Sequence, residues 1–242
     1  MATLALHYDL DAALLTDLPS DDEMTGLMID HAELLGWSQG FDPEDRDSWT
    51  WQVNEMTRIS GATGLTYSVQ VSLPHDRPVR APWAGITTCA QDLLGRWFVG
   101  EPAGYSFAFD ATVTAVRQSS DPEFFDRVPV SPGASVGVSF FAGQERPGGV
   151  DLLDTVLAEA RGLVIGPSSR QRNGMALETG APPLPEFHGT PWEHVAALDT
   201  HLREWSPLLV GSLASTVMFT AAELRVPGPL MIHLRRTTTP TT

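Results

Sequence analysis

The sequence contains no lysine, and all fifteen of its basic residues are arginine. This absence excludes catalysis through a lysine Schiff base and phosphate binding by a P-loop lysine. Thirty acidic residues leave a formal net charge of −15, and a field of that sign repels polyanions and acidic membrane surfaces. We therefore expect no nucleic-acid partner and no membrane partner, whereas a basic protein partner would suit the charge.

Cysteine is almost absent, because Cys89 is the only one in 242 residues. A lone cysteine excludes a disulfide framework and a cysteine-rich zinc site. Cys89 has helical spacing with Ile86, Leu93 and Trp97, which predicts that it is a small buried apolar side chain. No apolar run approaches the roughly 18 residues of a membrane span. The N-terminus also lacks a basic region followed by a cleavage site, so we expect a soluble protein of the cytoplasm.

Several familiar cofactor and metal motifs are missing as well. The chain has no G-x-G-x-x-G, H-E-x-x-H or C-x-x-C, so nucleotide cofactors and zinc hydrolysis have no support. His201 and Glu204 could share a metal, but His194 is seven residues from His201, which is about 10 Å along a helix axis. We predict neither a metal site nor a cofactor.

The clearest structural signal lies in residues 65–73, LTYSVQVSL, where apolar and polar residues alternate without a miss. A period of two over nine residues is typical of a strand with one buried face. Residues 49–54 alternate in the same way, and residues 60–64 offer a turn between the two runs. We therefore predict a β-hairpin at the centre of an antiparallel sheet.

Four stretches are predicted to be helical, and two of them begin with a capping box. Ser20-Asp21-Asp22-Glu23 and Thr190-Pro191-Trp192-Glu193 each place a hydroxyl residue three positions before a glutamate. The predicted helices span residues 20–36, 86–97, 151–162 and 190–206. Further strands are predicted at residues 3–8, 107–115, 135–140, 163–165, 175–178, 208–219 and 230–234.

This order of elements reads as β-α-β-β-α-β twice, followed by one more strand. We predict an α+β fold of antiparallel sheets with helices packed on one face, arranged as two tandem ferredoxin-like (βαββαβ) units. The units would span residues 1–117 and 134–235, with a connector at 118–133 and a disordered tail at 236–242. The alternative is a single irregular α+β domain, because the two halves share no convincing sequence similarity.

The polar sides of the predicted strands carry uncharged groups where a solvated sheet would carry more ions. Serine and threonine tolerate partial burial, whereas ions do not. We predict that two sheets face each other and enclose a barrel-like cavity with polar walls. The alternative is a solvated sheet rich in threonine. The polar residues in question are Thr50, Gln52, Asn54, Thr66, Ser68, Gln70, Ser72, Thr112, Thr114, Ser135 and Ser139.

Three titratable residues are the predicted catalytic groups. Asp110 lies in the middle of a predicted strand, where aspartate is disfavoured. In a cavity it would be a general base with a raised pKa, and otherwise it is a solvated or arginine-paired carboxylate. His7 and His233 lie in terminal strands on the less apolar side, so either could shuttle a proton near neutral pH. The alternative is that both are structural or surface histidines.

The predicted ligand-binding residues are those that would line the cavity or its mouth. Two guanidinium groups on one turn could hold a carboxylate or a phosphate, although a solvated turn would look the same in sequence. The lining residues are Trp51, Gln52, Tyr67, Gln70 and Thr112, and the two arginines are Arg170 and Arg172.

Two functions remain open on these observations. The first is a small-molecule binding protein that acts as a cofactor-independent enzyme of the cyclase, isomerase or lyase type. It rests on the uncharged polar strand faces and the seven tryptophans. The second is an acidic interaction protein, such as an inhibitor, an immunity-type protein or an adaptor, that masks a basic partner surface. It rests on the net charge of −15 and on the lack of a strong catalytic motif.

Overall fold

The structure is a computed structural model. The described residues are 2–9, 18–35, 51–60, 64–73, 79–80, 83–110, 115–116, 134–142, 149–160, 163–164, 169–170, 192–226 and 228–237. They form an α+β fold with one eight-stranded sheet, a separate two-stranded pair and four helices. The sheet strands are β1 (Ala2–Asp9), β2 (Gln52–Ser60), β3 (Gly64–Ser72), β5 (Gly104–Asp110), β7 (Ala134–Ala142), β8 (Ser169–Arg170), β9 (Glu193–Leu202) and β10 (Pro229–Arg236). The pair is β4 (Val79–Arg80) with β6 (Ala115–Val116), and the helices are α1 (Asp21–Leu34), α2 (Trp83–Leu94), α4 (Gly149–Glu159) and α5 (Pro207–Glu223).

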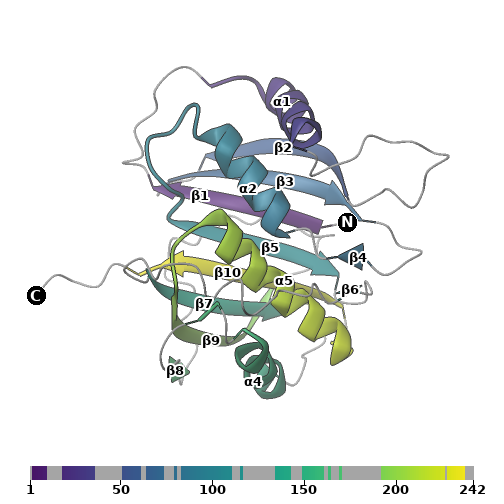
Figure 1. The fold of residues 1–242 in the computed structure, drawn as a ribbon, viewed down its shortest axis with the longest axis vertical. Helices are drawn as coiled ribbons and strands as arrows, with labels where there is room; N and C mark the ends of the chain where they lie inside the picture. The colour runs from purple at the N-terminus through teal and green to yellow at the C-terminus, as the bar shows by residue number, and fades with distance from the viewer. Residues whose placement is uncertain are drawn as a thin grey trace, which may run out of the picture.

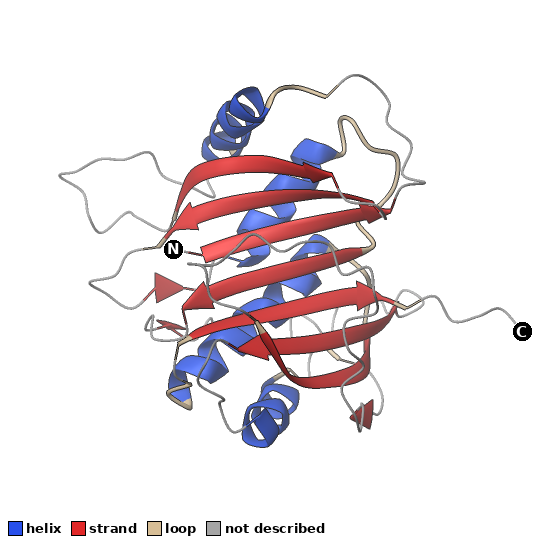
Figure 2. Cartoon of the chain, turned by 180° about the vertical axis from the view of Figure 1, so that it is seen from behind, coloured by secondary structure: helices blue, strands red, loops and turns tan. Residues whose placement is uncertain are grey.

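The large sheet is antiparallel throughout and has the strand order β2-β3-β1-β5-β10-β7-β9-β8. Seven of its strands have seven to ten residues, and β8 has two. All four described helices lie on one side of it, with α2 and α5 over its middle (Figure 1). Figure 2, seen from behind, shows the sheet in front of the helices. We call the side that the helices cover the helix face and the other side the far face.

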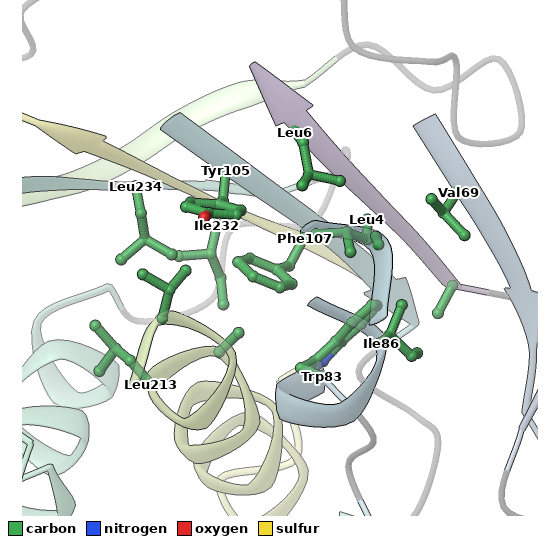
Figure 3. Packing of buried hydrophobic residues seen from close by; sticks show 14 of the residues in the cluster. Leu4, Leu6, Val69, Trp83, Ile86, Tyr105, Phe107, Leu213, Ile232 and Leu234 are labelled. Carbon is green, nitrogen blue, oxygen red and sulfur yellow. The ribbon is translucent and has the colours of Figure 1, made fainter. Parts of the chain in front are cut away.

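The helix face is built from large apolar side chains. On β5, Tyr105 and Phe107 point toward the helices, and Trp83 of α2 meets the Phe107 ring edge-on at 5.2 Å between centroids (Figure 3). Trp83 and Phe107 are fully buried. Burial of each such side chain contributes about 2 kcal/mol, so this layer is the main source of folding free energy.

The helices α2 and α5 touch through their backbones at Gly211. A Cβ atom placed on Gly211 would lie 2.5 Å from Ala84 Cα and 2.6 Å from Trp83 O. Only glycine allows this approach, because any side chain would overlap the backbone of α2. The contact therefore sets the distance between the two central helices.

The hairpin predicted around residues 65–73 is confirmed as β2 and β3, but its predicted place at the centre of the sheet is wrong, because β2 is an edge strand. The two strands pair antiparallel from Gln52 and Ser72 at one end to Ser60 and Leu65 at the other. The register shifts between Val53 and Glu55, and an extra residue in one strand moves the following side chains to the other face. This irregularity explains why Glu55, which continues the phase of apolar residues in sequence, is exposed.

The first predicted capping box is also confirmed. Ser20 Oγ accepts a hydrogen bond from the Glu23 amide at 3.4 Å, and Glu23 Oε2 accepts one from the Ser20 amide at 2.9 Å. The helix α1 then buries Met24, Met28 and His31 against the sheet and α2. His31 Nε2 lies 2.7 Å from Asp92 Oδ2, so a hydrogen-bonded histidine ties α1 to α2.

Two predictions in the C-terminal half are wrong. The predicted helix at residues 190–206 is replaced by strand β9, which pairs with β7 along its whole length. The predicted strand at residues 208–219 is the helix α5, whose N-cap is Ser206 with Pro207 in the first turn. This helix is apolar on nearly every side, so its sequence lacks the 3.6-residue period by which a helix is recognised.

The predicted pair of facing sheets is wrong as well. The halves join edge to edge, because β5 pairs with β10 from Gly104 opposite Arg235 to Asp110 opposite Pro229. The described strands thus form one open sheet and enclose no barrel-like cavity. The predicted connector lies outside the described residues, and Arg236, which the prediction placed in the tail, is the last residue of β10. None of the described helices is long and apolar enough to cross a membrane.

Candidate functional site

A buried polar network lies on the far face at the centre of the sheet. Along β1 the side chains alternate, so that Leu4 and Leu6 reach the helices while Ala5 and His7 point to the far face. The strands β3 and β5 flank β1 on its two sides, and β10 lies beyond β5. This order brings His7, Ser106 and His233 together, although His7 and Ser106 are 99 residues apart in sequence and Ser106 and His233 are 127 apart.

Ser106 is the centre of the network. Its hydroxyl oxygen lies 2.7 Å from His7 Nε2 and 2.9 Å from His233 Nδ1, so it hydrogen-bonds both imidazoles. The other ring nitrogen of His7, Nδ1, lies 3.0 Å from Thr66 Oγ1. The two imidazole rings tilt toward each other, with centroids 5.4 Å apart. We call these four residues, Thr66, His7, Ser106 and His233, the far-face network.

Gly104 makes room for the two rings. It lies opposite His7 on β1 and opposite Arg235 on β10. A Cβ atom here would lie 3.5 Å from His233 Cε1, 3.6 Å from His7 Cδ2 and 2.9 Å from the Leu234 carbonyl oxygen. A glycine at this position therefore lets both imidazoles lean over the strand toward Ser106.

Burial keeps both imidazoles uncharged at neutral pH. His7 is 7% exposed and His233 is 9% exposed. Loss of hydration lowers the pKa of His7 well below its usual value of 6.5, and the neighbouring His233 lowers it further. Burial likewise lowers the pKa of His233 to about 4, with a smaller contribution from Arg235. Each ring therefore carries one N–H and one free acceptor nitrogen.

Two proton arrangements satisfy the hydrogen bonds of the far-face network. In one, His7 Nε2–H donates to Ser106, and the Ser106 hydroxyl donates to His233 Nδ1. In the other, His233 Nδ1–H donates to Ser106, Ser106 donates to His7 Nε2, and His7 Nδ1–H donates to Thr66. The two arrangements differ only in proton positions, so the network can pass a proton from one histidine to the other.

This geometry suits proton transfer better than acyl transfer. A neutral imidazole beside a hydroxyl is the pairing used for general acid–base work. Acyl transfer would also need convergent donors for an oxyanion, but the backbone N–H groups of the strands around Ser106 are engaged in the sheet ladder. The chemistry available to these four residues is therefore the uptake, relay and release of a proton.

The third predicted catalytic residue, Asp110, is on the far face but distant from the histidines. It lies four residues beyond Ser106 on β5, opposite Pro229, and four residues of strand span about 13 Å. It is half-buried. Sequence reasoning thus selected the two histidines that meet, and the structure places Asp110 at the other end of the strand.

The predicted ligand-binding residues are spread over the molecule. Gln70 is half-buried on the far face opposite Thr3, whereas Gln52 is exposed at the start of β2. Trp51 and Tyr67 are buried in the main apolar core with the helix-face side chains. Arg170 lies in the edge strand β8, and Thr112 and Arg172 lie outside the described residues. Gln70 shares the face of the far-face network, but it lies four residues from Thr66 on β3, which is about 13 Å.

Sequence reasoning missed Ser106, because the strand was predicted to begin at Phe107. The signal was present in the preceding residues, where Tyr105 and Phe107 alternate with Ser106 and Ala108. Extension of the period by two positions would have placed Ser106 on the same side as Asp110. No local pattern, however, indicates that this strand lies two away from β3 and next to β10.

A second serine–histidine pair lies nearer the sheet edge. Ser135 Oγ on β7 is 3.0 Å from His201 Nε2 on β9, and this pair is exposed. Residues 133–137, GASVG, have the G-x-S-x-G spacing of a hydrolase nucleophile. That motif requires a sharp turn between a strand and a helix, whereas Ser135 lies within β7. Ser135 is therefore not at a nucleophile elbow. The exposed Ser135–His201 pair serves as a control for the buried far-face network.

The described residues hold no group of three histidine, cysteine, aspartate or glutamate side chains that could bind a metal ion. His194, one of the three residues weighed as metal ligands, packs edge-on against the Phe141 ring at 5.4 Å between centroids. Cys89 is fully buried, and burial raises the pKa of its thiol to about 12. No protein-family model matches this chain, and no curated protein sequence is significantly similar to it.

Proposed function

We propose that the chain binds a small molecule at the far face and transfers protons to or from it through the far-face network, without a cofactor. The observation that carries this proposal is that one buried hydroxyl, Ser106 Oγ, bridges two imidazoles that burial keeps neutral. A neutral imidazole can accept a proton from a ligand, and the Ser106 hydroxyl can relay a proton to the second imidazole. An isomerase or a lyase needs this kind of acid–base pair.

The cost of the network supports a functional role. Burial of two imidazoles and two hydroxyls requires that every polar atom find a partner, and each failure costs about 1–3 kcal/mol. Leucine or valine at these positions would fill the sheet face without that requirement. His7 and His233 are 7% and 9% exposed, and the proposal requires that this small opening lead to the rings.

We also infer that the two halves of the chain are tandem ferredoxin-like units. The order β2-β3-β1-β5 in the N-terminal half is repeated as β8-β9-β7-β10 in the C-terminal half. Both correspond to the split βαβ, or ferredoxin-like, order when each half is read as β-α-β-β-α-β. We take the two halves as tandem units that meet at β5 and β10, which places Ser106 and His233 on the shared seam.

The test is ligand binding followed through the histidine rings. Histidine-labelled protein is titrated with a library of neutral, anionic and cationic fragments, and ring C–H signals of His7 and His233 are recorded by NMR. We expect at least one chemical class to shift both rings. Hits that contain an acidic C–H are then incubated in D2O, and we expect their exchange to be faster with the protein than with buffer.

Two variants decide whether the network is responsible. Ser106→Ala removes the bridge, and we expect loss of the catalysed exchange. The matched control is Ser135→Ala, which removes a serine from the exposed pair with His201 and leaves the exchange unchanged. If no fragment moves the His7 and His233 signals, or if both variants behave alike, the proposal is wrong.

A second candidate function is that of an acidic interaction protein. The helix α1 supports it, because it presents four exposed carboxylates, Asp22, Glu23, Asp30 and Glu33. A basic partner would bind this surface in a salt-dependent way. The test is titration with a polyarginine peptide. If Asp22→Asn with Glu23→Gln and Asp30→Asn leaves the affinity unchanged, α1 is no such surface.

A further inference from the structure

The helix α1 lies along one edge of the large sheet. The strand β2 is the last strand on that side, and Figure 1 shows α1 beside it. An edge strand presents unpaired backbone N–H and C=O groups, which form a template for pairing with another chain. The opposite edge ends in β8, which has only two residues. Among the described strands, β2 is therefore the edge with the greater length available for pairing.

Two backbone amides of β2 donate to side chains of α1. The Met56 amide donates to Thr25 Oγ1 at 2.9 Å. The Arg58 amide donates to Asp21 Oδ1 at 3.3 Å. Alternate residues of an antiparallel strand direct their backbone groups to opposite sides, so Met56 and Arg58 both face away from β3. The amides that a further strand would use are thus occupied by α1.

The helix is also fixed to the rest of the molecule away from these two contacts. Met24 and Met28 are buried in the same apolar core as Met56. At the C-terminal end of α1, His31 Nε2 lies 2.7 Å from Asp92 Oδ2 of α2. Any strand that paired with β2 would have to move α1 from this position.

Two further features of β2 oppose pairing at the same edge. The register with β3 shifts between Val53 and Glu55, and such an irregularity bends an edge strand. Glu55 and Arg58 are exposed and charged. Bulges, exposed charges and a covering helix are the means by which native proteins protect an open edge. Their combination at β2 indicates that this edge is protected against pairing.

We propose that α1 prevents β2 from pairing with the β2 strand of a second copy of this chain. Two copies related by a two-fold axis would run these strands antiparallel. Each copy would then offer the other the outward backbone groups of Met56 and Arg58, and one continuous sheet would cross both chains. This inference concerns the sheet edge and does not depend on the proposed function at the far face.

The charge of the chain gives the pairing a characteristic salt dependence. Each copy carries a net charge of −15, so two copies repel each other. Salt screens this repulsion, and pairing through β2 should therefore strengthen as the ionic strength rises. Binding of a basic partner to the carboxylates of α1 would weaken under the same change. Salt thus separates self-pairing from recognition of a basic partner.

The experiment measures self-association of the full chain by sedimentation velocity at low and high salt. Asp21→Ala with Thr25→Val removes both acceptors from α1, which frees the edge amides and loosens the helix. We expect this double variant to self-associate about thirtyfold more tightly than the unmodified chain, the effect of two net hydrogen bonds. The association should be tighter at high salt than at low salt.

The first control is Asp22→Ala, which removes the same charge from the same turn of α1. Asp22 is exposed, so we expect this variant to sediment as the unmodified chain does.

The second control blocks the edge itself. In the double variant, Arg58→Pro removes the outward N–H of β2 without a loss from the ladder with β3, because proline is tolerated where the N–H faces outward. We expect it to reverse the association. Arg58→Ala keeps the amide and should leave the association in place, which distinguishes edge pairing from aggregation of a partly unfolded chain.

Three outcomes would overturn the inference. One is that the double variant sediments as the unmodified chain does at both salt concentrations. Another is that Arg58→Pro and Arg58→Ala have the same effect on its association. The third is that the unmodified chain already dimerises and Arg58→Pro makes it monomeric, since β2 would then be open while α1 is in place. None of these results bears on the histidine signals by which the proposed function is tested.

Discussion

The two faces of the sheet are both buried at their centre, but by different chemistry. On the helix face, Phe107 and Trp83 pack with aliphatic side chains in one continuous apolar core. On the far face, the same three central strands bury His7, Ser106 and His233 in a hydrogen-bonded network. Apolar packing is tolerant of exchange, whereas a buried polar network is stable only when each partner is present. This difference is the reason for assigning function to the far face.

On the helix face, we expect a large loss of stability when a substitution disrupts the packing. Gly211→Ala would place a Cβ atom 2.5 Å from Ala84 Cα, and the helices must separate to admit it. We expect a loss of about 3 kcal/mol or more in the free energy of unfolding, measured by urea denaturation. Gly26→Ala in α1, with no atom within 4 Å of its Cβ, should instead gain up to about 1 kcal/mol.

The far face should be sensitive to acid where the helix face is not. The pKa of His233 is about 4 in the folded chain and 6.5 when unfolded, so the unfolded state binds more protons between these values. Stability is therefore complete above pH 6.5 and falls as the pH decreases toward 4, by about 3 kcal/mol for this residue. His7 acts in the same direction.

Measurement of unfolding free energies from pH 7 to pH 4 checks this dependence. His233→Gln should remove about 3 kcal/mol of the difference between these two pH values. His201→Gln is the control, because His201 is an exposed histidine on the same sheet. Equal pH dependence in the two variants would contradict the assignment of the effect to buried histidines.

Two buried serines on the far face should respond differently to the same substitution. Ser106→Ala removes the hydrogen bonds to His7 Nε2 and to His233 Nδ1, and we expect a loss of about 1–3 kcal/mol. Ser68→Ala removes a hydroxyl that makes no hydrogen bond to the residues that the structure describes, so the protein should keep its stability or gain slightly. Thermal unfolding of the two variants at pH 7 gives the comparison, and equal losses would mean that Ser68 has a structural partner.

The smallest effect is expected at the exposed edge. Asn54 and Ser72 hydrogen-bond each other at 2.9 Å between β2 and β3, where water competes for both groups. Asn54→Ala should cost no more than about 0.5 kcal/mol. A loss as large as that of Ser106→Ala would show that depth in the sheet does not decide the cost of a polar contact.

The sequence predicted the N-terminal half better than the C-terminal half. The strand around Tyr67 has a strict two-residue period because only one of its faces is covered by helices, and its prediction as β3 is confirmed. The helix α5 is buried on most sides, so its residues carry no period and were predicted as a strand. Thr190 and Glu193 have the spacing of a capping box, but pairing of β9 with β7 outweighs that local signal.

The sequence predicted two residues of the candidate site, but not that they lie together. His7 and His233 were selected because each lies on the polar side of a strand, and both positions are on the far face. Ser106 was missed at a strand boundary, which is the least certain part of a sequence prediction. The facing sheets were wrong because the two halves join through β5 and β10, and an edge-to-edge contact leaves no trace in the alternation of residues.

The sequence by itself determined which sides of β1 and β3 are polar, where α1 begins and that lysine chemistry is excluded, because these depend on residue type and on spacing along the chain. Only the tertiary structure decided that His7, Ser106 and His233 meet, since 99 and 127 residues separate the bonded pairs. The physical reason is that β1, β5 and β10 become neighbours through backbone hydrogen bonds, which are the same for every sequence. The choice of neighbour is made by the packing of whole elements, and the network follows from that choice.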